Sequence, residues 1–275
     1  MACSDADYAF LRHLVLKQSA NLIEPSRNAL FETRLTPVVR LAGAPNLEGL
    51  VGLLRENQPA HLHRAVAEAM TISETSFFRD FHPFEALRRN IIPRLVEQKQ
   101  NQRKLRIWSA ASSTGQEAYS LAMMLCEHFP ELSRWDVKVL GTDISASVLS
   151  YAQRGRYRRI EVNRGLPARM LVKYFKRYGD EWEVLPAIRA MCDFSHANLC
   201  APFPVLPQFD LVLLRNVLLY FPRQHRTDVF RNVAQQMSQT GYLVLGNAEQ
   251  AEDSTNLFQA EFATNCYFYR PASAT

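Results

Sequence analysis

Apolar residues recur every three or four positions through the first seventy residues, a spacing typical of amphipathic helices. Pro25 opens a second helical segment, the Gly-Ala-Pro sequence at 43–45 ends it, and Pro59 suits the first turn of a further helix. This pattern predicts a small all-helical domain, which we place at residues 1–75. Its expected core consists of Phe10, Leu11, Leu14, Val15, Leu30, Leu35, Val38, Leu47, Leu50, Val51, Leu54, Leu62, Val66 and Met70.

From residue 105 onward, short apolar runs alternate with helical stripes. Alternation of this kind predicts an α/β fold, a doubly wound and mostly parallel sheet that binds ligands at the carboxyl ends of its strands. We place this domain at 105–275, after a linker at 76–104. Strands are expected at 105–109, 136–140, 209–214, 242–245 and 266–270, with helices after residues 115 and 143 and at 222–237.

The alternation is interrupted between residues 154 and 198. Leu171, Tyr174, Phe175 and Tyr178 have the spacing of one helical face, and strand-like runs follow at 182–185 and 188–191. The sequence therefore predicts a small β-containing subdomain inserted into the sheet domain.

The composition narrows the class of protein further. Hydrophobic residues make up 47% of the 275 residues, which is enough for a core and excludes disorder. No apolar run approaches the ~18–20 residues of a membrane helix, and the first ten residues lack the basic and apolar runs of a secretory signal. Five scattered cysteines without C-x-x-C favour reduced thiols, and no histidine pair has metal-ligand spacing. We expect a cytoplasmic protein without metal or membrane insertion.

The net charge of +5 is unevenly distributed. Residues 88–106 contain seven basic residues and one acidic residue, and residues 154–177 contain nine basic residues and one acidic residue. These segments are either solvated surface or patches that dock an acidic partner, a nucleic acid or an acidic protein surface.

Two polar segments have both a structural and a functional interpretation. In S-A-A-S-S-T-G-Q-E at 109–117, small residues at a strand-to-helix turn allow a ligand to approach the backbone. The segment is neither G-x-G-x-x-G nor a P-loop, which disfavours a nicotinamide enzyme or an NTPase. Thr114 and Glu117 also fit a capping box that needs no ligand, and Thr71 and Glu74 fit a second one at a predicted helix start.

Two further candidates lie at the ends of predicted strands. Asp143 follows the second strand, where an acidic residue accepts hydrogen bonds from the ribose hydroxyls of a nucleoside or caps the next helix. Arg215 and Asn216 follow the most apolar strand, where a doubly wound fold places its site. Together with the loop before Glu117, Asp143 favours a nucleoside-containing ligand.

Five motifs in this order resemble one family. T-I-S-E-T-S-F-F-R-D, R-I-W-S-A-A-S-S-T-G-Q-E-A-Y-S, G-T-D-I-S, R-N-V-L-L-Y-F and G-Y-L-V-L-G-N-A-E look like those of the chemotaxis receptor glutamate methyltransferases, the CheR family. The likeness runs from about residue 8 to residue 270. It implies that S-adenosylmethionine donates a methyl group to glutamates on the acidic cytoplasmic helices of chemoreceptors, in chemotaxis signalling or adaptation, and that S-adenosylhomocysteine is released.

The resemblance also implies which residues form the site. It replaces both capping interpretations, because Glu117 is then expected to bind the methionine ammonium group and the segment after Thr71 to belong to a lid that extends into 76–104. The chain departs from the family at Ser73, where Asn is frequent, and at Gln116, where Glu is frequent. Residues that match the family's cofactor contacts are Ser73, Thr75, Arg79, Glu117, Asp143, Asn198, Leu199, Arg215 and Asn216.

Methyl transfer to a carboxylate needs no general base, because a glutamate with a pKa of ~4.3 is already ionised at neutral pH. Catalysis then depends on alignment, and we assign Arg79 and Tyr220 to orienting the substrate carboxylate. Two other functions stay open: a non-catalytic module that binds the cofactor and tethers partners, and a nucleic-acid methyltransferase. The second is disfavoured because the chain lacks an Asn/Asp-Pro-Pro-aromatic motif and a Pro-Cys nucleophile, so we expect no nucleic-acid partner.

Overall fold

The computed structural model describes residues 3–56, 60–201, 203, 208–251 and 256–272. The chain divides into two compact units, one of Met1–Ile72 with Tyr220–His225 and one of Ser73–Leu219 with Arg226–Thr275. Within the described residues, no helix is long and apolar enough to cross a membrane.

The smaller unit is helical, as predicted, and contains no strand among its described residues. Its α-helices are α1 (Asp5–Ser19), α2 (Ala29–Arg34), α3 (Thr36–Leu41), α4 (Leu47–Arg55) and α5 (Ala60–Met70), and a 3-10 turn, η1, covers Pro25–Arg27. The second predicted helical segment is divided into three pieces, because Pro37 lies in the first turn of α3 and cannot continue α2. Pro59 lies outside the described residues. The predicted core is buried except for Phe10 and Leu30, which are partly exposed.

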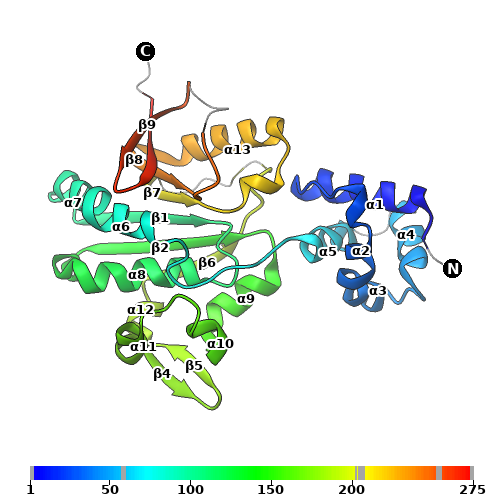
Figure 1. The fold of residues 1–275 in the computed structure, drawn as a ribbon, viewed down its shortest axis with the longest axis horizontal. Coiled ribbons are helices and arrows are strands. Elements are labelled where there is room, and N and C mark those ends of the chain that lie inside the picture. Colours follow the sequence, from blue (N-terminus) through cyan, green and yellow to red (C-terminus); the bar gives the residue numbers. More distant parts are fainter. Residues whose placement is uncertain (1–2, 57–59, 202, 204–207, 252–255, 273–275) are drawn as a thin grey trace. The chain divides into compact units, whose positions relative to one another are not determined.

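The larger unit is built on a seven-stranded sheet in the order β6-β2-β1-β7-β8-β10-β9. Six strands run in the same direction and β10, between β8 and β9, runs opposite to them, so the doubly wound, mostly parallel sheet is confirmed (Figure 1). From β1 the chain adds β2 and β6 on one side of the sheet and β7 and β8 on the other. The switch point of the sheet therefore lies between β1 and β7. The strands are β1 (Lys104–Ala110), β2 (Asp136–Asp143), β6 (Cys192–His196), β7 (Phe209–Leu214), β8 (Met237–Leu245), β9 (Phe258–Ala263) and β10 (Cys266–Pro271).

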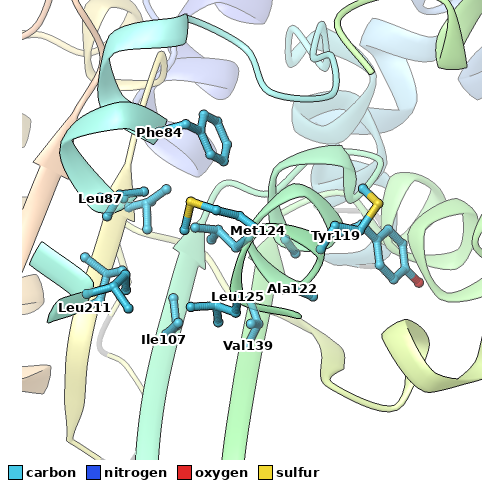
Figure 2. Close-up of a cluster of buried hydrophobic side chains, with 14 of the residues drawn as sticks. Phe84, Leu87, Ile107, Tyr119, Ala122, Met124, Leu125, Val139 and Leu211 are labelled. Atoms are coloured by element: carbon cyan, nitrogen blue, oxygen red, sulfur yellow. The ribbon is translucent and has the colours of Figure 1, made fainter. Parts of the chain in front are cut away.

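The helices of the larger unit cover the sheet. They are α6 (Phe81–Ala86), the π-helix η2 (Leu87–Ile91), α7 (Ile92–Lys99), α8 (Gln116–His128), the 3-10 turn η3 (Pro130–Arg134) and α9 (Ala146–Arg154). The 3-10 turn η4 (Leu218–Tyr220) and α13 (Arg223–Gln236) also belong mainly to this unit, although Tyr220–His225 group with the smaller one. Figure 2 shows Phe84 and Leu87 beside Met124 of α8, over strand residues such as Ile107 and Leu211. The segment expected as a linker therefore contributes buried side chains to the sheet's core, while the boundaries of the functional domains stay predictions.

The insertion carries its own three-stranded sheet, in the order β3-β5-β4 (Figure 1). Two expectations for it were wrong. The predicted helical face ends at Tyr174, because Phe175 begins a strand that pairs with β5 through a turn at Gly179, whose φ is +58°. The predicted strand at 188–191 is a helical turn that starts at Pro186, and β6 beyond it belongs to the main sheet. The elements are β3 (Arg156–Arg158), α10 (Arg159–Val162), α11 (Ala168–Tyr174), β4 (Phe175–Tyr178), β5 (Glu181–Val184) and α12 (Pro186–Arg189).

Candidate active site

The ends of β1, β2, β6 and β7, which we call the carboxyl edge, carry most of the predicted site residues. The loop after β1 is unusually bent, because Ala111, Ser113 and Gly115 all have left-handed backbone angles, with φ of +57°, +51° and +90°. Gly115 takes the cap position of α8, where it offers no side chain. The capping box that a ligand-free interpretation offered is not formed: the Thr114 hydroxyl donates to the Gln116 side chain, and Glu117 has other partners.

Glu117, which is partly buried, forms an ion pair with the buried Arg215 across the switch point. Arg215 Nη1 lies 2.7 Å from one Glu117 oxygen, and the Ser109 hydroxyl donates to the other oxygen at 2.7 Å. Arg215 Nη2 donates to the Arg79 carbonyl at 2.6 Å and to the Asp80 carboxylate at 3.0 Å. The Arg215 side chain is 1% exposed. Two carboxylates and one guanidinium leave this cluster with one net negative charge, which suits a cationic group on a ligand.

Arg215 also has an unmet hydrogen-bonding group. Its Nε is buried and has no hydrogen-bond partner in the described part of the chain. The resemblance places Arg215 among the residues that match the family's cofactor contacts. In the structure it links Glu117 to residues 79 and 80, so it connects the lid segment to the end of β7.

Asp143 accepts two backbone hydrogen bonds at the end of β2. Its carboxylate oxygens lie 2.9 Å from the amide nitrogen of Ser113 and 3.0 Å from that of Ser145. The cap residue of α9 is Ser145, so Asp143 is not the helix cap that one interpretation offered. Two amides from different loops instead fix the orientation of a carboxylate that sequence analysis assigned to a ribose.

Asn198 and Leu199 follow β6, the strand that pairs with β2. The amide of Ala197 donates to the Asp143 carbonyl at 3.0 Å, which places the start of this loop next to Asp143. The Asn198 side chain accepts a hydrogen bond from the Cys200 amide, and Leu199 is buried. Both residues therefore follow the strand beside the proposed ribose site.

Residues 73–80 form no helix or strand and turn at Phe77 and Phe78, so the helix start that a capping box at Thr71 would give is not formed. Thr71 directly follows the last turn of α5 and donates its hydroxyl to the Glu68 carbonyl. The Ser113 hydroxyl donates to the Ser73 carbonyl at 2.6 Å, and the Phe78 amide donates to the Ser120 hydroxyl at 3.0 Å. The segment is therefore fixed to the loop after β1 and to α8.

The inserted subdomain also contacts this segment. Phe77 is fully buried, with its ring 5.0 Å from that of Tyr157 and 5.6 Å from that of Phe175. Gly165 approaches so closely that a Cβ there would lie 2.0 Å from the Phe77 carbonyl oxygen. Residues 73–80 therefore pack as part of the larger unit, with both the sheet and the insertion.

The predicted substrate-orienting residues have different surroundings. The Arg79 guanidinium pairs with Glu74, with an Nη2–Oε2 distance of 3.2 Å, and Glu74 also pairs with Arg164 of the insertion. Tyr220 groups with the smaller unit, where its carbonyl accepts the Leu22 amide. Thr75 is partly buried and makes no side-chain hydrogen bond among the described residues. The catalytic roles of Arg79 and Tyr220 stay predictions.

Sequence analysis missed Glu249, which lies in the last of the five motifs. Its carboxylate is buried and accepts hydrogen bonds from the backbone of the Asn216 loop. The available signal was an acidic residue shortly after the apolar strand β8, at the same edge as the other candidates. No group of three or more His, Cys, Asp or Glu side chains in the described ranges could hold a metal ion.

The two basic segments carry fewer unpaired charges than their sequence suggests. Ten of their sixteen basic side chains lie within 4.0 Å of a carboxylate. Several of these partners are distant in sequence, such as Asp210 for Lys99 and Glu261 for Arg94. Any docking patch is therefore smaller than the charge count predicts.

Comparison with known proteins shows the family of this chain. Residues 73–267 match the family described as CheR methyltransferase, SAM binding domain. The chain is 34% identical over 275 aligned residues to chemotaxis protein methyltransferase 1 of Pseudomonas aeruginosa, covering 98% of this chain and 99% of that protein. It is 34% identical to chemotaxis protein methyltransferase Cher2 of Pseudomonas putida, covering 90% and 92%. It is 32% identical to the chemotaxis protein methyltransferase of Vibrio parahaemolyticus, covering 93% of each chain.

Proposed function

This chain belongs to the CheR methyltransferase family, and on that premise we propose that it methylates glutamate side chains on the cytoplasmic helical domain of chemoreceptors. It is an S-adenosylmethionine-dependent protein-glutamate O-methyltransferase of chemotaxis. The observation that carries the proposal is a pair of oriented carboxylates: Asp143 at the end of β2, and Glu117 in the first turn of α8, the helix that follows the adjacent strand β1. The receptor domain, the cytoplasmic location and the role of each residue belong to the proposal.

The carboxyl edge fits the chemistry of this cofactor. Asp143, held by two amides, would accept the ribose hydroxyls. Glu117 would accept the ammonium group of the methionine portion, since a carboxylate has about four acceptor positions and only two are used by Ser109 and Arg215. The net negative charge of the Glu117 cluster favours that cation. Asn198, Leu199 and Asn216 would complete the site from the neighbouring strand ends.

When bound, S-adenosylmethionine supplies a methyl group on a positively charged sulfur. A substrate glutamate carboxylate forms a bond to that carbon as the carbon–sulfur bond breaks, so the products are a methyl ester and S-adenosylhomocysteine. The carboxylate needs no base, because it is ionised at neutral pH. The protein contributes alignment, which can lower the barrier by ~7–11 kcal/mol, and Arg79 and Tyr220 would orient the incoming carboxylate.

The test uses the full chain, S-adenosylmethionine with a labelled methyl group and the cytoplasmic fragment of a chemoreceptor. Methylation of a glutamate predicts protein-bound label that mild base releases as methanol, and glutamine substitutions at the acceptor sites should abolish it. Cofactor binding without label on any receptor fragment would favour a tethering module. Label in DNA or RNA would favour a nucleic-acid methyltransferase.

Tyr220→Phe separates catalysis from tethering, because it removes one hydroxyl and keeps the ring. We expect turnover at saturating cofactor to fall at least about tenfold, with the melting temperature nearly unchanged, if the hydroxyl orients the carboxylate. Arg79→Ala should lower turnover too, although part of its effect would appear in cofactor affinity. Full turnover in the phenylalanine variant would leave Tyr220 as a packing residue.

A further inference from the structure

Glu249 binds a run of consecutive backbone amides. Its side chain, in a residue that is 8% exposed, accepts hydrogen bonds from Asn216 at 2.6 Å, Val217 at 2.8 Å, Leu218 at 2.7 Å and, at the longer distance of 3.4 Å, Leu219. The amide of Gly246 donates to the same carboxylate at 2.9 Å. One side chain thus organises the whole loop that follows β7.

The backbone of this loop requires such a partner. Asn216 has a left-handed φ of +59°, a conformation that costs free energy in a non-glycine residue. The following amides converge on one point, which is the geometry of an anion-binding concavity. An unsatisfied buried amide costs ~1–3 kcal/mol, so the loop keeps this shape only while an acceptor occupies the concavity.

Gly246 leaves the space in which the carboxylate sits. A Cβ at this position would lie 2.6 Å from Glu249 Oε2, 2.8 Å from Asn216 Nδ2 and 2.9 Å from the Asn216 amide nitrogen. No side chain larger than hydrogen fits there without displacing Glu249 or Asn216. The glycine and the acid therefore act together on the same loop.

We propose that Glu249 is a positioning residue for the cofactor site, an inference that rests on the proposed function. It fixes the backbone of Asn216. Because Arg215 is the preceding residue, this also fixes the backbone position from which the Arg215 side chain extends to Glu117. It acts through these residues and contacts neither the methyl group nor the substrate. Its carboxylate takes the place that a bound anion would occupy, which keeps the loop in its binding shape before the cofactor arrives.

The test compares Glu249→Gln with Asp210→Asn. Asp210 is also a buried carboxylate, 3% exposed, that accepts a backbone amide, from Arg106 at 2.9 Å, but it lies at the opposite end of β7. Glutamine keeps the volume of Glu249 and replaces one acceptor oxygen with an NH2 group. At a temperature where all variants are folded, we expect Glu249→Gln to weaken S-adenosylmethionine binding at least about tenfold by calorimetry. Asp210→Asn should lower the melting temperature and leave affinity within about twofold of the wild type.

Equal affinity in Glu249→Gln and wild type would overturn the proposal and make Glu249 a stability residue. Gly246→Ala tests the same loop from the other side and should also weaken binding, even if Glu249→Gln folds poorly. In the wild type without ligand, the amides of 216–218 and 246 should resist hydrogen exchange like those of β7; rapid exchange would also overturn the proposal. If the wild type bound no S-adenosylmethionine but showed this protection from exchange, the proposed function would be wrong, whereas the conclusion that Glu249 fixes the loop would still stand.

Discussion

The two ends of the parallel sheet both bury charged groups, but they satisfy them differently. At the amino edge, where the strands begin, Asp210 pairs with Lys99 at 2.7 Å and accepts the Arg106 amide. At the carboxyl edge, Arg215 keeps a buried Nε without a hydrogen-bond partner among the described residues, although it contacts Glu117 and Asp80.

Backbone strain is distributed in the same way. Of the nine non-glycine residues with positive φ in the described ranges, five belong to the carboxyl edge or to the segment that packs on it, and one, Arg103, precedes β1. The five are Phe78, Asp80, Ala111, Ser113 and Asn216. Strain and unmet polar groups persist where the surrounding structure holds them in place, so this difference supports our proposal that the site lies at the carboxyl edge.

The largest expected effect comes from Arg215→Ala. It leaves the carboxylate of Glu117, whose side chain is only 13% exposed, without its cation, so the free energy of unfolding should fall by ~3 kcal/mol, the lower end of the range for buried pairs. Arg106→Ala breaks the pair with Asp136 at the amino edge, where Asp136 is 57% exposed, and should cost only about 1 kcal/mol or less. Urea denaturation of both variants measures the difference. Equal losses would mean that the two edges do not differ in how their ion pairs support the fold.

Asp143→Ala sharpens the comparison at the level of binding. Two hydrogen bonds to a charged group, each worth ~1.5–3 kcal/mol, would be lost from the ribose, so affinity for S-adenosylmethionine should fall at least about tenfold. Calorimetry with both S-adenosylmethionine and S-adenosylhomocysteine measures this loss. Asp210→Asn is the amino-edge control, and an Asp143 variant with the same affinity as that control would remove the ribose assignment.

The sequence was sufficient for five of the seven strands of the main sheet, β1, β2, β7, β8 and β10, and it predicted the edge at which we propose the site. Apolar runs identified β7 at its observed bounds, and polar residues placed directly after strands identified Asp143 and Arg215. It was insufficient where a partner is distant along the chain. The capping box at Thr114 and Glu117 is a valid local pattern, but Arg215, 98 residues away, binds the Glu117 carboxylate instead.

The same limit explains the other differences. Glu249 had no visible role because four of its five amide partners lie 30 to 33 residues away. The segment 188–191 has strand-like residues, yet Pro186 begins a helical turn there and β6 follows only afterwards. Charge runs overstated the basic patches, because their carboxylate partners come from other elements. Local propensity is therefore overridden where tertiary hydrogen bonds and ion pairs compete with it.

A smaller effect on stability is expected from a change at Glu127, in the last turn of α8. This residue binds Lys173 and Tyr174 of the insertion. Hydrogen bonds from Lys173 and then Tyr174 lower the pKa of its carboxyl group below the ordinary value of 4.5. A lowered folded-state pKa stabilises the fold above pH 4.5, and this stabilisation is lost as the pH falls through the folded-state value. Glu127→Gln should therefore flatten the acid side of the stability curve, measured by thermal melts. S-adenosylmethionine affinity at neutral pH should not change, and a large change would mean that the insertion's attachment also shapes the cofactor site.

The smallest effect concerns the basic segments, where docking onto acidic receptor helices and a merely solvated surface predict different salt responses. Charges on an exposed surface are screened beyond ~8–10 Å at 0.10–0.15 M salt, whereas partly buried pairs such as Arg215–Glu117 are screened far less. The Michaelis constant for a receptor fragment should therefore rise with salt, while cofactor affinity stays nearly constant. Because ten of the sixteen basic side chains already pair with carboxylates, we expect the rise to be modest.

Arg159 and Arg169 make no ion pair among the described residues, so replacing both with glutamine should reduce the dependence of the Michaelis constant on salt if they help the insertion dock. A Michaelis constant that does not respond to salt, or one that moves together with cofactor affinity, would show that these segments are solvated surface and that recognition of the receptor depends on other contacts.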